Sequence, residues 1–134
     1  MNIMIAEDDP TCGTLLQELL RPYGQCRRAQ NGLEAVELYR QSLRKGPPFE
    51  LICLDIMMPV MNGQDALREI RELERQHGIG GFDMVKIIMT TVLEDARNII
   101  QALVRGPCEG YITKPISRQA INEKMKELGF KKIP

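Results

Sequence analysis

The chain has 134 residues, 43% of them hydrophobic, which is enough apolar material for the core of one ordinary domain. Lys and Arg together number 18, as do Asp and Glu. The chain therefore has no net positive field to attract nucleic acid or an acidic membrane surface. We expect a single domain over residues 1–134, with no direct nucleic-acid partner.

The cysteines and the chain start indicate the compartment. The four cysteines are widely separated, lack a CxxC pair and have only His77 to complete a zinc site. We predict that they are buried free thiols in a reducing compartment. The first residues lack the parts of a signal peptide, and no segment has membrane-spanning length. These features favour a cytoplasmic protein without membrane insertion.

Short apolar runs alternate with segments of helical period five times along the chain, which is typical of a parallel sheet covered by helices. The predicted strands are residues 2–6, 25–29, 51–54, 86–89 and 111–113. The second strand is the least apolar and is expected at an edge, whereas the other four can be buried on both faces. We predict an α/β fold: a five-stranded parallel sheet, doubly wound with five helices, in the flavodoxin-like order 2-1-3-4-5.

Apolar side chains at helical spacing follow each predicted strand. They are Leu15, Leu16, Leu19 and Leu20; Leu33, Val36, Tyr39 and Leu43; Leu67, Ile70 and Leu73; Ile99, Ile100, Leu103 and Val104; and Ile121, Met125 and Leu128. Asp9 before Pro10 and Ser117 are expected helix caps, and Asn31-Gly32 is a predicted turn before the second helix. Residues 77–83, with three glycines, are predicted to form a mobile loop.

Polar residues follow four of the predicted strands. They are Glu7, Asp8 and Asp9 after the first strand, Asp55 after the third, Thr90 and Thr91 after the fourth, and Lys114 after the fifth. In a doubly wound sheet the chemistry lies outside the carboxyl ends of the strands, near the point where strand order reverses. We therefore expect carboxylates, a hydroxyl and an ammonium to meet at one edge.

Such a group of carboxylates requires a cation. Two carboxylates about 5 Å apart repel by roughly 3 kcal/mol at an effective dielectric constant of about 20. Oxygen ligands suit a hard ion, and Mg²⁺ bound by carboxylates, waters and a phosphate oxygen is the usual arrangement. Asp55 can then attack phosphorus to give an aspartyl phosphate, with Lys114 supplying an ammonium and Thr91 a hydroxyl donor.

Four motifs in this order resemble those of the response-regulator receiver domains of two-component signalling, the CheY-like family. The motifs are IMIAEDDP, LICLDIMMPVMNG, IIMTTV and GYITKPI. The resemblance covers nearly the whole chain. It implies a signalling switch that catalyses only its own phosphoryl transfer and slow self-dephosphorylation, rather than an enzyme that turns over a substrate.

The resemblance also assigns roles to individual residues and to partners. It implies Asp55 as phosphoacceptor, Asp8 as direct Mg²⁺ ligand, Glu7 as outer ligand through water, the Met57 carbonyl as further ligand, Thr91 and Tyr111 as switch residues, and a cis Lys114–Pro115 bond. The implied phosphodonor is a sensor histidine kinase or a histidine phosphotransfer protein. The implied target surface comprises the fourth helix, the fifth strand and the fifth helix.

The chain departs from the commonest family pattern at several positions. Glu7 stands where aspartate is frequent, and Val92 follows the switch hydroxyl where alanine is usual. Met57 and Leu93, two residues after the acceptor and the switch hydroxyl, are apolar and do not readily orient an attacking water. We therefore predict slow loss of the phosphoryl group, and a half-life of seconds would contradict this prediction.

Several alternatives remain open at this point. An aspartate-nucleophile Mg²⁺ phosphatase shares the carboxylate and the metal, although Met57 stands where it needs a second carboxylate. A flavodoxin shares the topology, but three acids in the first loop would repel a flavin phosphate. Tyr111 can be an ordinary core aromatic, and strand alternation lets at most one of Thr90 and Thr91 reach the site. The chain can also be a receiver cut from a longer regulator.

Overall fold

The computed structural model describes residues 1–92 and 108–134, and its five strands form one parallel sheet in the order β2-β1-β3-β4-β5. The strands are β1 (Asn2–Ala6), β2 (Gln25–Ala29), β3 (Leu51–Asp55), β4 (Lys86–Val92) and β5 (Gly110–Lys114). The predicted order is confirmed, with β2 at an edge. Strand β2 lies on one side of β1, and β3, β4 and β5 follow in order on the other side. The strand order therefore reverses between β1 and β3, which is the switch point of the sheet.

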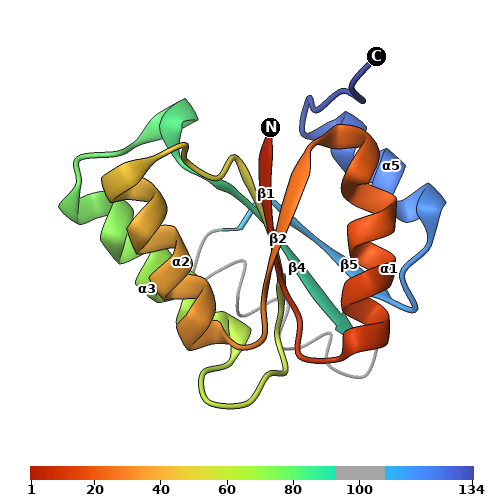
Figure 1. Ribbon diagram of the computed structural model, residues 1–134, viewed down its shortest axis with the longest axis horizontal. Helices are drawn as coiled ribbons and strands as arrows, with labels where there is room; N and C mark the ends of the chain where they lie inside the picture. The colour runs from red at the N-terminus through yellow and green to blue at the C-terminus, as the bar shows by residue number, and fades with distance from the viewer. Residues whose placement is uncertain (93–107) are drawn as a thin grey trace.

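Helices cover both faces of this sheet. The α-helices are α1 (Pro10–Leu20), α2 (Gly32–Lys45), α3 (Gly63–Gln76) and α5 (Arg118–Glu127), and the 3₁₀ helices are η1 (Arg21–Tyr23) and η2 (Gly81–Asp83). Helices α1 and α5 lie on one side of the sheet, and α2 and α3 lie on the other (Figure 1). The predicted fourth helix, with Ile99, Ile100, Leu103 and Val104, lies outside the described residues.

The core has two layers because side chains alternate along each strand. Ile3 and Ile5 pack in the layer that contains the apolar side chains of α1 and α5. Met4 and Ala6 pack in the layer of α2 and α3. Every residue of β3 is buried, which fits a central strand covered on both faces.

Two expectations about burial were wrong. The fifth strand is not buried on both faces, because β5 is the other edge of the sheet and Tyr111 is 45% exposed. Leu15 and Leu33 are exposed, although both belong to predicted apolar stripes. Each lies roughly 100° around its helix from the mean direction of the buried side chains, since successive residues are about 100° apart.

The predicted helix caps are confirmed. Asp9 accepts a hydrogen bond from the backbone of Thr11 at 3.3 Å, and Ser117 accepts one from Ala120 at 3.1 Å. The predicted turn at 31–32 also caps a helix, since the Asn31 side chain accepts from the Glu34 backbone at 2.8 Å. The Asn62 cap of α3 was missed; its side chain accepts from the Asp65 backbone at 2.9 Å.

The remaining expectations concern cysteines, the glycine-rich segment and membranes. All four cysteines are free, but only Cys53 of them is buried, so the expectation of four buried thiols was wrong. Residues 77–83 contain the short helix η2 and two glycines with positive φ, Gly78 and Gly81; mobility there stays a prediction. In the part of the chain that the structure describes, no helix is both long enough and apolar enough to cross a membrane.

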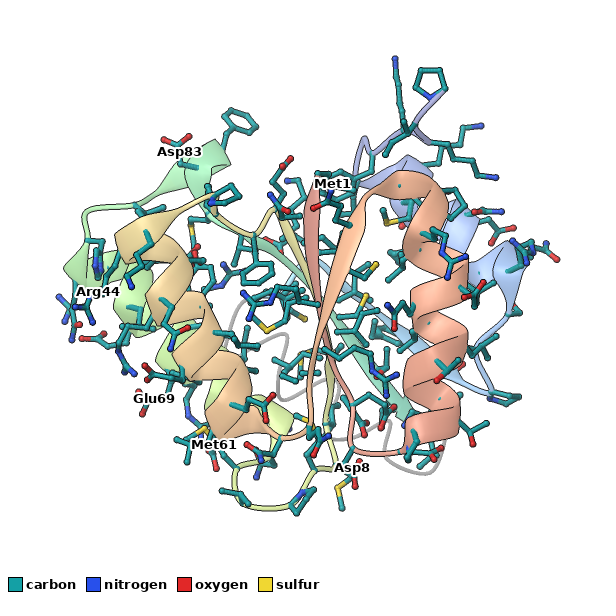
Figure 2. The ribbon with its side chains drawn as sticks, in the orientation of Figure 1. Met1, Asp8, Arg44, Met61, Glu69 and Asp83 are labelled. Carbon is teal, nitrogen blue, oxygen red and sulfur yellow. The ribbon has the colours of Figure 1, made fainter. Side chains whose placement is uncertain are left out.

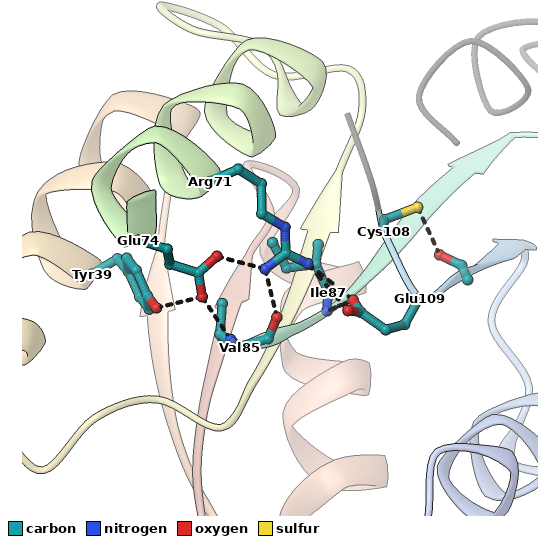
Figure 3. Close-up of polar contacts among 8 residues, drawn as sticks. Tyr39, Arg71, Glu74, Val85, Ile87, Cys108 and Glu109 are labelled. Carbon is teal, nitrogen blue, oxygen red and sulfur yellow. Dashed lines mark hydrogen bonds and ion pairs between the residues drawn. The ribbon is translucent and has the colours of Figure 1, made fainter. Parts of the chain in front are cut away.

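A buried polar network joins α2, α3 and the start of β4 at the amino end of the sheet (Figure 3). Glu74, fully buried, accepts hydrogen bonds from the Tyr39 hydroxyl at 2.9 Å and from the Val85 backbone at 2.7 Å. Arg71 donates to Glu74 at 2.7 Å and pairs with Glu109, which precedes β5, at 3.1 Å. The network therefore links the segment before β5 to helix α3.

Candidate functional site

Three carboxylates meet at the carboxyl edge of the sheet. Glu7 and Asp8 follow β1, and Asp55 ends β3. Ala6 is paired in register with Leu54, so Glu7 lies level with Asp55. One oxygen from each of the three carboxylates lies within 4.8 Å of the others. The predicted acidic cluster is thus assembled, with Asp8 exposed at the sheet edge (Figure 2).

Lys114 completes the cluster from the end of β5. Its ammonium Nζ lies 2.7 Å from Glu7 Oε1 and 3.4 Å from Asp55 Oδ2. Glu7 is 1% exposed and Asp55 is 3% exposed, so these ion pairs are little screened by water. The expected pairing of Lys114 with acidic neighbours is confirmed, and the Lys114–Pro115 peptide bond is cis as expected.

The surroundings shift the pKa values of the two buried carboxyl groups, Glu7 and Asp55, in opposite directions. Burial, followed by the neighbouring Glu7, raises the pKa of Asp55 from 3.8 to about 7. Burial opposes ionisation of Glu7 too, but hydrogen bonds with Lys114 and Asp55 outweigh it and lower the Glu7 pKa. The two carboxylates raise the pKa of Lys114 despite its burial. Glu7 and Lys114 therefore form the ionised pair, and Asp55 is the carboxyl group that is costly to ionise.

Cys12 is a neighbour of the cluster that the sequence reading missed. Burial and a hydrogen bond with Glu7 raise the pKa of its thiol to about 12, so it remains protonated. Cys12 lies in the first turn of α1, which begins at the carboxyl edge of the sheet. The sequence signal for this contact was the position of Cys12 in the first turn of the helix that follows Glu7 and Asp8.

The two threonines at the end of β4 face opposite sides of the sheet. Thr90 is paired in register with Asp55 and therefore shares its face, which is the α1 and α5 side. Thr91 lies on the other face, together with Tyr111. Since the Tyr111 side chain is 45% exposed, its reading as an ordinary core aromatic was wrong.

The loop between β3 and α3 approaches the acceptor strand closely. A Cβ atom on Gly63 would lie 2.2 Å from the carbonyl oxygen of Asp55, so only glycine fits there. Val60 has a φ of 69°, and the backbone of Met61 donates to Pro59 at 2.7 Å across it. The Met57 side chain is exposed, and metal binding by its carbonyl stays a prediction.

The chain matches the response regulator receiver domain family over residues 3–126. It belongs to this family. The receiver domain is a signalling module, and this assignment favours a switch over the phosphatase and flavodoxin alternatives.

Individual relatives support the assignment. The receiver domain is 32% identical to the receiver domain of Ssk1 from Saccharomyces cerevisiae, in a co-crystal structure with the histidine phosphotransfer signaling protein Ypd1. That match has a TM-score of 0.80 and covers 96% of this chain and 88% of the other. This chain is also 30% identical to response regulator SSK1 of Arthrobotrys oligospora, over 96% of its length. It is 28% identical to chemotaxis protein CheY of Halobacterium salinarum over 94% of each chain.

The receiver domain spans only a small part of some relatives. It covers 14% of the length of the Arthrobotrys oligospora protein and 20% of that of the Saccharomyces cerevisiae protein SSK1.

Proposed function

We propose that this receiver domain accepts a phosphoryl group on Asp55, with Mg²⁺ bound beside it, and passes the signal to a partner protein. The main support for this proposal is the position of Asp55. It is a nearly buried carboxylate between two further carboxylates and one ammonium. A nucleophile, sites for a cation and a positive side chain are the parts that phosphoryl transfer to a carboxylate requires.

The donor set fits Mg²⁺. Glu7, Asp8 and Asp55 each supply a carboxylate oxygen, and a hard cation prefers such ligands. We assign direct contacts to Asp8, Asp55 and the Met57 carbonyl, and a contact through water to Glu7. When bound, the ion neutralises charge on the carboxylates and on the transferring phosphoryl group.

The chemistry needs one bond made and one broken. An oxygen of Asp55 bonds to the phosphorus of a phosphohistidine, the phosphorus–nitrogen bond breaks, and the leaving imidazole takes up a proton. Lys114, 3.4 Å from Asp55 Oδ2, is placed to pair with a phosphoryl oxygen. The Thr91 hydroxyl, which lies on the other face of β4, becomes a further donor only when it shifts toward the phosphoryl group.

The signal leaves through the face next to β5. Thr91 and Tyr111 lie on the same face of neighbouring strands, so a shift of Thr91 toward the phosphoryl group vacates space that Tyr111 can enter. The proposed output surface then comprises β5, α5 and the predicted fourth helix, which lies outside the described residues. A phosphoryl group shifts the balance between two conformations only through better contacts in one of them.

The partner is a histidine phosphotransfer protein or a sensor histidine kinase. This proposal is supported by the yeast relative, which was solved together with the histidine phosphotransfer protein Ypd1. We also propose that residues 1–134 form a single receiver domain and that it acts in the reducing cytoplasm, in keeping with its free cysteines.

The deciding experiment is mass spectrometry after incubation with acetyl phosphate and Mg²⁺. The parent should gain one phosphoryl mass, and Asp55→Asn should gain none. Asp83→Asn is a matched control, because Asp83 lies at the opposite end of the molecule from Asp8 (Figure 2). It should be modified like the parent. Modification of Asp55→Asn at the parent's level would reject Asp55 as the acceptor.

A further inference from the structure

Thr90 places a buried hydroxyl beside the proposed acceptor. Thr90 is 1% exposed, and its Oγ1 atom has no hydrogen-bond partner among the residues that the structure describes. A buried polar atom without a partner destabilises a fold, so such atoms are rare and call for an explanation. In contrast, the Thr91 hydroxyl on the other face donates to the Val92 carbonyl at 3.3 Å.

The sheet register places Thr90 next to Asp55. The two residues are paired between β3 and β4, and paired residues in neighbouring strands have backbones about 4.8 Å apart with side chains on the same face. The same face carries Glu7 and Lys114, since these residues follow the alternation of Ile5 and Ile112. Thr90 is therefore a fourth polar side chain in this group.

The charges around Thr90 change when Asp55 is phosphorylated. Without the phosphoryl group, the Lys114 ammonium pairs with Glu7 and with Asp55 Oδ2. A phosphoryl group on one oxygen of Asp55 draws the ammonium toward its own oxygens, which carry more charge. The other oxygen of Asp55 then has no ammonium beside it, and besides its contact with Mg²⁺ it keeps a lone pair that can accept a hydrogen bond from the same face.

We infer that Thr90 is a positioning residue of the phosphorylated state. Its hydroxyl donates a hydrogen bond to the Asp55 oxygen that is not bonded to phosphorus, and this fixes the orientation of the acyl phosphate. The inference rests on the proposed function of Asp55. Because the hydroxyl is unpaired before phosphorylation and paired after it, Thr90 favours the phosphorylated state.

Two substitutions separate the hydroxyl from the shape of the side chain. Thr90→Val keeps the volume and removes the hydroxyl, whereas Thr90→Ser keeps the hydroxyl and removes the methyl group. Beryllofluoride with Mg²⁺ serves as the stand-in for the phosphoryl group on Asp55. For each protein, beryllofluoride affinity and stability to urea without beryllofluoride are measured, with Asp55→Asn as the control that should not bind.

The expected results differ between the two measurements. Thr90→Val should bind beryllofluoride about tenfold more weakly than the parent, as expected for one lost hydrogen bond of ~1.4 kcal/mol. Its stability without beryllofluoride should equal or exceed that of the parent. Thr90→Ser should bind within about twofold of the parent.

Three outcomes would overturn the inference. Parent-like affinity of Thr90→Val would show that the hydroxyl makes no bond in the phosphorylated state. Loss of stability in Thr90→Val without beryllofluoride, with unchanged affinity, would show a structural hydrogen bond instead. A parent that binds no beryllofluoride would reject the proposed function of Asp55 and this inference with it, so the two failures are distinguishable.

Discussion

Asp55 is a carboxyl group whose surroundings favour the protonated form as long as no cation is bound. Burial is the largest cause, and the neighbouring Glu7 adds to it. The same surroundings that make Asp55 costly to ionise make a bound cation favourable, because the cation compensates the charge of the ionised carboxylate.

This arrangement predicts an unusual pH dependence of stability. Because the folded-state pKa of Asp55 is raised to about 7, the folded protein holds a proton that the unfolded chain has released, and stability falls as pH rises through that window. In a metal chelator, the parent should lose on the order of 1–3 kcal/mol more stability than Asp55→Asn between about pH 5 and about pH 8.

Urea unfolding at a series of pH values checks this prediction. Asp83→Asn, far from the site (Figure 2), should follow the parent. Parallel profiles for the parent and Asp55→Asn would contradict the raised pKa.

Val60 is a second residue whose local conformation predicts a measurable effect. Its φ of 69° lies in the left-handed region, which a β-branched residue rarely adopts. Val60→Gly should raise the free energy of unfolding by about 1 kcal/mol, since strain of roughly 1–3 kcal/mol is relieved and part of it is offset by the freedom of glycine in the unfolded chain. Val60→Ala, which keeps the Cβ atom, should gain less stability than Val60→Gly. Denaturant titration measures both variants, and a loss of stability in Val60→Gly would show that the strain is absent.

At the scale of elements, the network around Glu74 holds α2 and α3 against β4. Glu74 lies four residues after Ile70, on the buried side of α3. It accepts hydrogen bonds from the Tyr39 hydroxyl of α2 and from the backbone of Val85, the residue before β4 (Figure 3). Burial and the Glu74 carboxylate raise the pKa of Tyr39, so the hydroxyl stays a donor.

Breaking this network should be strongly destabilising. Glu74→Ala should lower the free energy of unfolding by about 3 kcal/mol, because it leaves Arg71 with less compensated charge and the Val85 backbone unpaired. Tyr39→Phe should cost less, about 1–2 kcal/mol, since it removes one hydrogen bond to a charged group. Chemical unfolding of each variant measures these differences.

Glu72→Gln provides the matched control on the same helix. The Glu72 side chain is 44% exposed and pairs with Arg75 at the surface, where ion pairs contribute little. The control should be indistinguishable from the parent. Equal effects of Glu72→Gln and Glu74→Ala would contradict a special role for the buried network.

For the whole molecule, the acidic cluster couples metal binding to folding. Its carboxylates come from the two residues after β1 and from the end of β3, so the unfolded chain does not hold them together. Mg²⁺ at about 100 times its dissociation constant should stabilise the folded protein by roughly 2.7 kcal/mol. Chelation should reverse the gain, and Asp8→Asn should reduce it.

Thermal unfolding with and without Mg²⁺ measures this coupling. Ca²⁺ is a useful comparison, because it prefers more ligands and longer distances than Mg²⁺. An unchanged unfolding temperature at high Mg²⁺ would contradict a metal site at this edge of the sheet.

Much of this protein was determined by local sequence. Strand periods, the proline after Asp9 and the order of the polar strand ends predicted the sheet and the cluster of Glu7, Asp8, Asp55 and Lys114, because each signal acts over a few residues. The burial of Glu74 could also have been inferred from the sequence, because Glu74 continues the helical spacing of the apolar residues of α3.

Only the tertiary structure decided which groups far apart in the sequence meet. The pairing of Thr90 with Asp55 depends on the register of two strands, and the bond from Tyr39 to Glu74 depends on how two helices pack. The same holds for the contact between Cys12 and Glu7 and for the exposure of Tyr111 on an edge strand. Local patterns leave these features open because register and helix packing are set by the shape of the whole core.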